Sequence, residues 1–470
     1  MIERIRTIVA GRGFRKLFWS LLSRGSSTIL SFALLFAASH ALETDEYGLY
    51  IFLFSVGSSL GLICVFGQQV LLVKHFRLQN HEPGRTNQGI LFYNSLWLLL
   101  GCGGQLLAAA LLWTFGEGLP APYDHLEIAL VFGAIFTLSE YLQGYFLVFG
   151  RIVLALMPRE NLWRLLCSLA LVGLAWGGWV TSGAAAAELV AGLLAIMVGY
   201  QAVHFVAAEG LGFLRSHGAR EDVPERVWRN ETLNFSANGF FQAAALYLET
   251  ILIGIAIGLD IAAFYFVANR IASLLILPVL AIDTVGVPLI SAKFQEKDHD
   301  GAQSLVAMLS AGSFVLALIG GVGLFFVGPF VLHLFDDAFV EHFPVLVLLS
   351  VGAIAHAFFG PGTWLMMIGG GEGYLLRIRS VIFVVYLALL FGLGSQFGPE
   401  GVAIAGLGQL LALHLVSRYW TIRHWKVDCA ATAFLALRWH DKRARETGDE
   451  PGGMERPVPA TGGSGENGSS

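Results

Sequence analysis

Long apolar runs separated by short polar connections follow one another from about residue 17 to residue 421. A helix that crosses a bilayer needs about 20 mostly apolar residues. On this criterion the pattern predicts twelve spans, at roughly 17–41, 49–73, 90–115, 127–149, 161–180, 185–207, 231–258, 262–290, 304–328, 341–367, 374–397 and 400–421. The expected fold class is therefore an all-α polytopic membrane protein.

The composition favours the same class. Of the 470 residues, 56% are hydrophobic and 13% are charged, whereas a soluble protein carries about 25% charged residues. The 56 glycines fit helices that approach one another closely in a membrane. The four cysteines stand apart and form no CxxC pair, so we expect packed side chains without a metal or a cofactor.

The distribution of basic residues predicts the orientation. All but two of the 29 Lys and Arg residues lie at the termini or near the connections after spans two, four, six, eight and ten. The two exceptions, Arg24 and Arg270, lie inside spans. Because cytosolic loops carry the excess of positive charge, both termini are expected in the cytosol.

The charged link "RSHGAREDVPERVWRNE" divides the spans into two sets of six. The predicted domains are a basic cytosolic arm (1–16), an N-terminal six-helix lobe (17–210), a cytosolic linker (211–230), a C-terminal six-helix lobe (231–421) and a cytosolic tail (422–470) that is disordered after about 446. Weak similarity around Tyr50 and Tyr265 favours a parallel repeat of the two lobes. In the tail, "CAATAFLAL" is too short to span and is expected along the membrane surface. We expect no cleavable signal peptide, because the hydrophobic stretch after the basic arm is too long, holds Arg24 and shows no A-x-A-like cleavage site.

Polar residues recur at helical spacing inside several spans, on one face of each helix. These stripes comprise Ser20, Arg24, Ser27, Thr28 and Ser31 in span one, Glu140 in span four, Asn234, Asn238, Gln242 and Glu249 in span seven, and Asn269, Arg270, Ser273 and Asp283 in span eight. Polar groups at this depth are tolerated inside the bundle or against water. Their presence on several helices predicts a shared polar cavity.

Each of these residues also has a simpler interpretation. Arg24 lies near enough to the cytosolic end of its span to reach the interface, whereas Arg270 lies nearer the outer side and favours the cavity. The carboxylates Glu249 and Asp283 serve either as ion-pair partners of the arginines or as proton or cation sites, and Glu140 has the same two alternatives. The hydroxyl and amide side chains, taken alone, would be explained by hydrogen bonds between helices. His356 and His414 are expected to be packed side chains.

No catalytic motif is present. There is no Walker loop, and the short exoplasmic connections hold no Lys or Arg for glycosyl transfer or hydrolysis. We therefore expect a protein that is not an enzyme.

Two stretches resemble a known family: "LETDEYGLYIFLFSVGSSLG" after span one and "GPEGVAIAGLGQLLALHLV" at the start of span twelve. With a six-plus-six arrangement over about 17–421, the chain resembles the Wzx-type polysaccharide flippases. These belong to the superfamily of multidrug and toxic-compound extruders (MATE), lipid II flippases and other oligosaccharide-lipid exporters. The resemblance implies two lobes around a V-shaped central cavity and transport by alternating access.

The resemblance also implies a substrate, a cellular location and partners. The expected activity is export of undecaprenyl-diphosphate-linked oligosaccharide repeat units across the bacterial cytoplasmic membrane, for surface or exopolysaccharide synthesis. The expected partners are this lipid-linked substrate, the bilayer and other polysaccharide-assembly membrane proteins, and no nucleic acid. The cavity of such flippases is commonly cationic, which matches Arg24 and Arg270 as diphosphate-binding residues by their position on spans one and eight.

Physical chemistry agrees with such a substrate. Arginine forms strong, often bidentate hydrogen bonds to phosphate, and a sugar chain that leaves water needs replacement hydrogen bonds. Ser27, Thr28, Ser31, Asn234, Asn238, Gln242, Asn269 and Ser273 are the candidate glycan-lining residues, and Glu140, Glu249 and Asp283 are the candidate ion-coupling residues. The alternative is a Na⁺- or H⁺-coupled multidrug exporter of the same superfamily. A glycan polymerase or ligase is less favoured, because no large exoplasmic loop is predicted.

Overall fold

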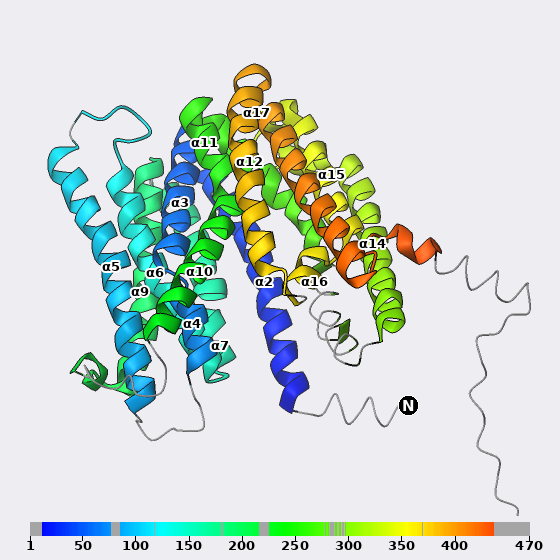
Figure 1. Ribbon diagram of the computed structural model, residues 1–470. Helices are drawn as coiled ribbons and strands as arrows, with labels where there is room; N and C mark the ends of the chain where they lie inside the picture. The colour runs from blue at the N-terminus through cyan, green and yellow to red at the C-terminus, as the bar shows by residue number, and fades with distance from the viewer. Residues whose placement is uncertain are drawn as a thin grey trace, which may run out of the picture. The chain divides into compact units, whose positions relative to one another are not determined.

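The computed structural model describes residues 12–76, 85–116, 118–179, 182–215, 225–277, 298–368 and 370–436, with scattered residues between 279 and 296 (Figure 1). Of residues 12–24 it gives the helix but not the side chains. Within these ranges all regular structure is helical, which confirms the predicted all-α fold class.

The described helices have the following labels and bounds. They are α2 (Arg12–Ala41), α3 (Thr44–Cys64), α4 (Gln68–His75), α5 (Arg85–Phe115), α6 (Leu126–Val148), α7 (Ile152–Leu156), the π-helix η1 (Met157–Leu162), α8 (Trp163–Trp176), α9 (Gly183–Glu209), the 3₁₀ helix η2 (Gly212–Arg215), α10 (Glu225–Ala243), the π-helix η3 (Ala244–Leu248), α11 (Glu249–Ala256), α12 (Leu259–Ser273), the 3₁₀ helices η4 (Leu274–Ile276) and η5 (Asp337–His342), α14 (His299–His333), α15 (Phe343–Phe359), α16 (Gly362–Ile368) and α17 (Glu372–Trp425).

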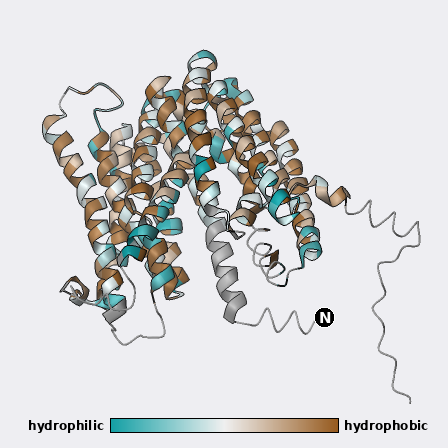
Figure 2. Cartoon of the chain, viewed as in Figure 1, coloured by the Kyte–Doolittle hydropathy of each residue, from teal (hydrophilic) through white to brown (hydrophobic). Residues whose placement is uncertain are grey.

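Nine helical segments of the described residues are long and apolar enough to cross a membrane. Figure 2 shows these helices coloured as hydrophobic along most of their length. Their exposed surface carries large apolar side chains such as Trp113, Phe115 and Phe326. Such continuous exposed apolar surface is typical of contact with lipid, so the chain is a multi-pass membrane protein.

The residues of predicted spans eleven and twelve lie in one element, α17, which is 54 residues long. Its backbone is broken at Gly398, where φ is +59° and ψ is −141°, and Pro399 follows. Because proline cannot continue the hydrogen bonds of a preceding helix, the two parts of α17 correspond to two spans.

Span five begins earlier than predicted. The sequence "MPRENL" was expected in a connection, but it forms η1 and joins α7 to α8, so the helical segment runs from Ile152 to Trp176. The charged residues are compatible with this position because they pair with one another and with α6, as described below.

The chain forms two compact units. Unit 1 comprises Met1–Leu275, Gly320–Ala353 and Val381–Leu410, and unit 2 comprises Ile276–Ile319, Ile354–Ser380 and Leu411–Ser470. The division into two six-helix lobes at residues 211–230 stays a prediction.

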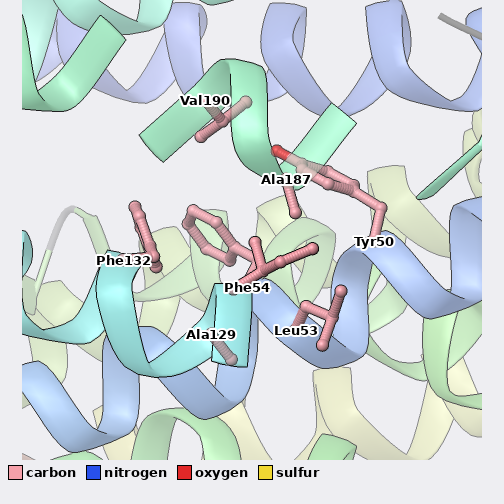
Figure 3. A pocket seen from close by; sticks show the side chains of 8 residues that line it. Tyr50, Leu53, Phe54, Ala129, Phe132, Ala187 and Val190 are labelled. Atoms are coloured by element: carbon pink, nitrogen blue, oxygen red, sulfur yellow. The ribbon is translucent and has the colours of Figure 1, made fainter. Parts of the chain in front are cut away.

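Helix α3 lies at the centre of unit 1, where it packs against α6, α9, α10 and α12. Its buried residues include Tyr50, Phe52 and Leu53. Figure 3 shows a small apolar cavity where Tyr50, Leu53 and Phe54 of α3 face Phe132 of α6 and Val190 of α9. Interlocking aromatic side chains of this kind give a rigid scaffold.

In unit 2 the chain directly after α17 packs against its own unit, and the position of "CAATAFLAL" along the membrane surface stays a prediction. Val427 and Cys429 are buried in a cluster with Ile290, Val306 and Leu365. Asp428 accepts two hydrogen bonds from Arg418, at 2.8 and 2.7 Å. The bidentate pair and the apolar contacts hold this segment against the unit. The region expected to be disordered, after about 446, lies outside the described residues.

Candidate functional site

A buried arginine occupies the π-helical segment of span five in unit 1. Arg159 is 8% exposed. Its Nη2 lies 2.6 Å from Oε1 of Glu140 on α6. Its Nη1 donates to Oε1 of Gln143 at 2.5 Å, and its guanidinium lies 4.6 Å from the ring centre of Phe136. Helix α6 thus supplies a charge, an amide and an aromatic face to one guanidinium.

A second ion pair joins this one to span one. Arg164 Nη1 lies 2.6 Å from Oε2 of Glu160. Ser27 Oγ donates to the same carboxylate oxygen at 2.8 Å, and it also accepts a hydrogen bond from Arg164. Asn161 donates to Ser26, the neighbouring hydroxyl on α2. The hydroxyl stripe of span one therefore meets charged groups of span five.

The network is electrically neutral, because its two arginines are matched by two glutamates. A neutral, hydrogen-bonded cluster is far less costly at bilayer depth than isolated charges. One donor stays unmatched: Arg159 Nε is buried and has no hydrogen-bond partner among the described residues. Buried donors are generally paired with protein, water or ligand, so this nitrogen is an exception within an otherwise well-paired network.

Both π-helices of the described chain lie beside polar groups. η1 carries Arg159 and Glu160, and η3 carries Tyr247. The guanidinium of Arg270 lies 5.8 Å from the ring of Tyr247 and 4.9 Å from that of Phe266. Because π-helical turns are rare and frequently occur at functional sites, these two turns support this part of unit 1 as the candidate site.

Among the described residues, the contacts of the Arg270 guanidinium are cation–π contacts. No carboxylate among the described residues lies within 4 Å of its guanidinium nitrogens. Glu249, one of the two partners considered from the sequence, is bonded elsewhere. Asp283, the other, lies outside the described residues.

Glu249 is held by two tyrosines. Its Oε2 accepts a hydrogen bond from Tyr265 Oη at 2.7 Å, and its Oε1 accepts one from Tyr386 Oη at 2.8 Å. Gly406 faces the carboxylate so closely that a Cβ there would come to 2.6 Å of Oε1. Two tyrosine hydroxyls thus supply hydrogen bonds to this carboxylate, one to each of its oxygens.

The amide stripe of span seven is exposed on the surface of unit 1. Asn234, Asn238 and Gln242 of α10 are all exposed, and Asn238 Nδ2 donates a hydrogen bond to the backbone oxygen of Asn234 at 3.2 Å. Asn269 and Ser273 of α12 are half-buried, and Ser273 Oγ donates to the Arg270 carbonyl.

The structure describes the remaining predicted residues only in part. Thr28 and Ser31 are half-buried on α2. Arg24 lies in α2, but its side chain is outside the described part. In unit 2, His356 Nδ1 lies 3.0 Å from His414 Nε2, and His414 stacks on Phe359. These histidines are packed, as the sequence suggested, but their direct contact could not be predicted across 58 residues.

Sequence reasoning did not single out the groups that do most to organise the site: Arg159, Glu160 and Arg164, at or near the connection after span four, and the hydroxyls of Tyr265 and Tyr386. One signal pointed to the former, because Glu140 needs a cation at this depth and "PRENLWR", a short distance further along the chain, holds two arginines. No cluster of three or more metal-ligating His, Cys, Asp or Glu side chains occurs among the described residues.

Comparison with known proteins gives similarity in structure alone. No protein-family model and no curated protein matches the chain. An inward-facing multidrug resistance MATE family transporter of the MOP superfamily matches with a TM-score of 0.59 at 15% identity, over 90% of this chain and 96% of that one. An outward-facing one matches with a TM-score of 0.54 at 15% identity, over 86% and 93%.

A MOP superfamily transporter from Pyrococcus furiosus, whose binding pocket has reverse polarity that suggests a different function, matches with a TM-score of 0.55 at 14% identity, over 87% and 94%. All three matches span most of both chains. The chain therefore has the fold of the MATE family transporters of the MOP superfamily.

Proposed function

We propose that this chain is a membrane transporter that works by alternating access and moves a lipid-linked oligosaccharide from the cytosolic to the outer leaflet. The fold supports the transport part, since similar structures are transporters seen in inward-facing and outward-facing conformations. The reversed pocket polarity of one of them indicates that the fold accommodates more than one class of substrate.

The exposed amide stripe of α10 carries the proposal. Asn234, Asn238 and Gln242 lie within a helix that is apolar enough to cross a membrane, yet their side chains are exposed on unit 1. Facing lipid would leave their amides without hydrogen bonds, so we infer that they face water or substrate. Amides both donate and accept hydrogen bonds, which matches the hydroxyls of a glycan.

Arg270 supplies the candidate phosphate contact. Its guanidinium lies over the rings of Phe266 and Tyr247, and no carboxylate among the described residues forms an ion pair with it. An edge-on guanidinium forms bidentate hydrogen bonds to phosphate oxygens. An inside-negative potential would favour outward movement of the anionic head by about 2.3 kcal/mol per charge per 100 mV.

This proposal retains the expected location: a bacterial cytoplasmic membrane, both termini cytosolic, alongside other polysaccharide-assembly membrane proteins. Arg24 stays a second candidate for the diphosphate. The hydroxyls of span one, Thr28 and Ser31, and the polar groups of span eight, Asn269 and Ser273, stay candidates for the glycan.

The test is lipid analysis after deletion of the gene, with complementation by the native chain, Arg270→Gln, Arg24→Ala and a control, Arg229→Gln. Arg229 is an exposed residue of α10 near its predicted cytosolic end. We expect a diphosphate-linked oligosaccharide to accumulate on the cytosolic leaflet, and the native chain and the control to clear it. Arg270→Gln should clear it at least tenfold more slowly at equal expression. A deletion strain with no lipid-linked intermediate would reject the flippase.

A second function, cation-coupled multidrug export, is favoured by the geometry of Glu249. A carboxylate held by two tyrosine hydroxyls can exchange a proton or Na⁺ during a transport cycle. Its test is dye efflux from cells that express Glu249→Gln, which keeps the shape but removes the charge. Loss of gradient-driven dye efflux in this variant, with normal glycan lipids in the deletion strain, would favour the exporter.

A further inference from the structure

A groove lies on the outer surface of unit 1 between the start of span five and α9, which lie side by side (Figure 1). It has a volume of about 1050 Å³. Its walls are mostly apolar and include Val153, Met157, Pro158 and Leu162, with Tyr200 opposite. The volume slightly exceeds the range of about 300–1,000 Å³ typical of small-molecule sites.

Two basic side chains lie among these apolar walls: Arg151 and His204. The ring of His204 packs edge-on against Tyr200, with ring centres 4.7 Å apart. Arg151 is exposed, and no carboxylate among the described residues forms an ion pair with it. The nearby Glu209 instead accepts a hydrogen bond from Tyr145. The groove therefore presents positive charge that the described protein does not neutralise.

The position of the groove indicates contact with lipid. Val153 and Met157 are 56% and 52% exposed, and Tyr200 is 53% exposed. The distribution of basic residues predicts that the turn at Gly150 and Arg151 lies at the cytosolic face. An apolar groove with a basic end at this level matches an anionic lipid, because the cytosolic leaflet is negatively charged.

The groove and the ion network share one element. Met157, Pro158 and Leu162 of η1 line the groove, whereas Arg159 and Glu160 of the same π-helix form the buried network. An occupant of the groove would therefore press on the backbone that positions Arg159.

We propose that this groove binds an anionic phospholipid of the cytosolic leaflet. An acyl chain lies along Val153, Met157 and Leu162, and the phosphate is bound by Arg151 and His204. This site is separate from the proposed transport site, and its test does not depend on the transported substrate.

The experiment is native mass spectrometry of the full chain, extracted from bilayers of equal phosphatidylglycerol and phosphatidylcholine. The variants are Arg151→Gln/His204→Gln, which removes the charge, and Met157→Trp, which fills the groove. Their matched controls are Arg229→Gln, another exposed arginine, and Leu169→Trp on α8, which is 62% exposed and outside the groove. Gel filtration and thermal midpoints verify that each variant is folded.

We expect the native chain and both controls to retain phosphatidylglycerol in preference to phosphatidylcholine. Both groove variants should retain about fivefold less phosphatidylglycerol: Arg151→Gln/His204→Gln because it removes the attraction to the lipid phosphate, and Met157→Trp because it fills the path of the acyl chain. The conservative variant Arg151→Lys, which keeps the positive charge, should retain phosphatidylglycerol. Equal retention of the two lipids by the native chain, or unchanged retention in both groove variants, would overturn the proposal. Displacement of phosphatidylglycerol by a polyprenyl phosphate would assign the groove to the tail of a transported lipid instead.

Discussion

At the scale of single residues, the burial of Arg159 depends on its surroundings on α6. The guanidinium is tolerated in a membrane-spanning segment because Glu140 neutralises it and Gln143 accepts a further hydrogen bond. Removing one partner of such a pair leaves the other as an unmatched buried charge, whereas replacing both removes the cost.

We therefore expect Glu140→Gln to lower the free energy of unfolding by about 3–5 kcal/mol. The double variant Glu140→Gln/Arg159→Met should recover most of this loss. The measurement is thermal unfolding in one detergent, followed by intrinsic fluorescence.

The control for this series is Glu296→Gln. Glu296 pairs with Lys293 at 3.1 Å, but its side chain is 62% exposed, and exposed pairs contribute about 0–1 kcal/mol. If Glu140→Gln proves as mild as this control, the pair with Arg159 does not hold α6 and η1 together.

At the scale of elements, the "DEYGLY" segment of α3 has a structural role in this fold. Glu46 accepts a hydrogen bond from the Gly183 backbone N–H at 2.6 Å, at the start of α9. A Cβ at Gly48 would collide with the Leu259 carbonyl at the start of α12. Tyr47 and Tyr50 are fully buried. One short motif thus fixes α3 against two other helices.

The break in α17 gives a prediction at the same scale. Gly398 has φ +59° and ψ −141°, a backbone region that is essentially restricted to glycine and costs other residues about 1–3 kcal/mol. We expect Gly398→Ala to destabilise the protein by this amount in thermal unfolding.

Gly392 is the matched control, six residues earlier in α17, where an added Cβ would meet nothing within 4 Å. Because alanine is favoured over glycine inside a helix by about 1 kcal/mol, Gly392→Ala should be neutral or stabilising. Equal effects of the two substitutions would mean that Gly398 does not adopt the strained conformation.

At the scale of the whole molecule, the basic residues predict which connections face the cytosol. Asp124 lies in an acidic connection and Arg226 in a basic one, and both are exposed. In intact cells, a membrane-impermeant maleimide should label Asp124→Cys. It should label Arg226→Cys only after permeabilisation, and the reverse pattern would contradict the predicted orientation.

Cys429 is expected to contribute little background to this measurement. Cys429, which follows the last span, is 1% exposed, and burial raises the pKa of its thiol to about 11. Because maleimides react with the thiolate, a raised pKa keeps this cysteine neutral and unreactive at pH 7. Labelling of Cys429 in the unsubstituted chain should therefore stay low at pH 7.

The sequence by itself determined the all-helical membrane fold, because each span needs a long local apolar run that a single chain displays directly. The candidate polar positions of α10 could also be read locally, since helical spacing places Asn234, Asn238 and Gln242 on one face. Only the tertiary structure decided which groups meet. The Arg159–Glu140 pair, the bond of Ser27 to Glu160 and the two tyrosines at Glu249 join residues on different helices, and their partners depend on helix packing that no local pattern records.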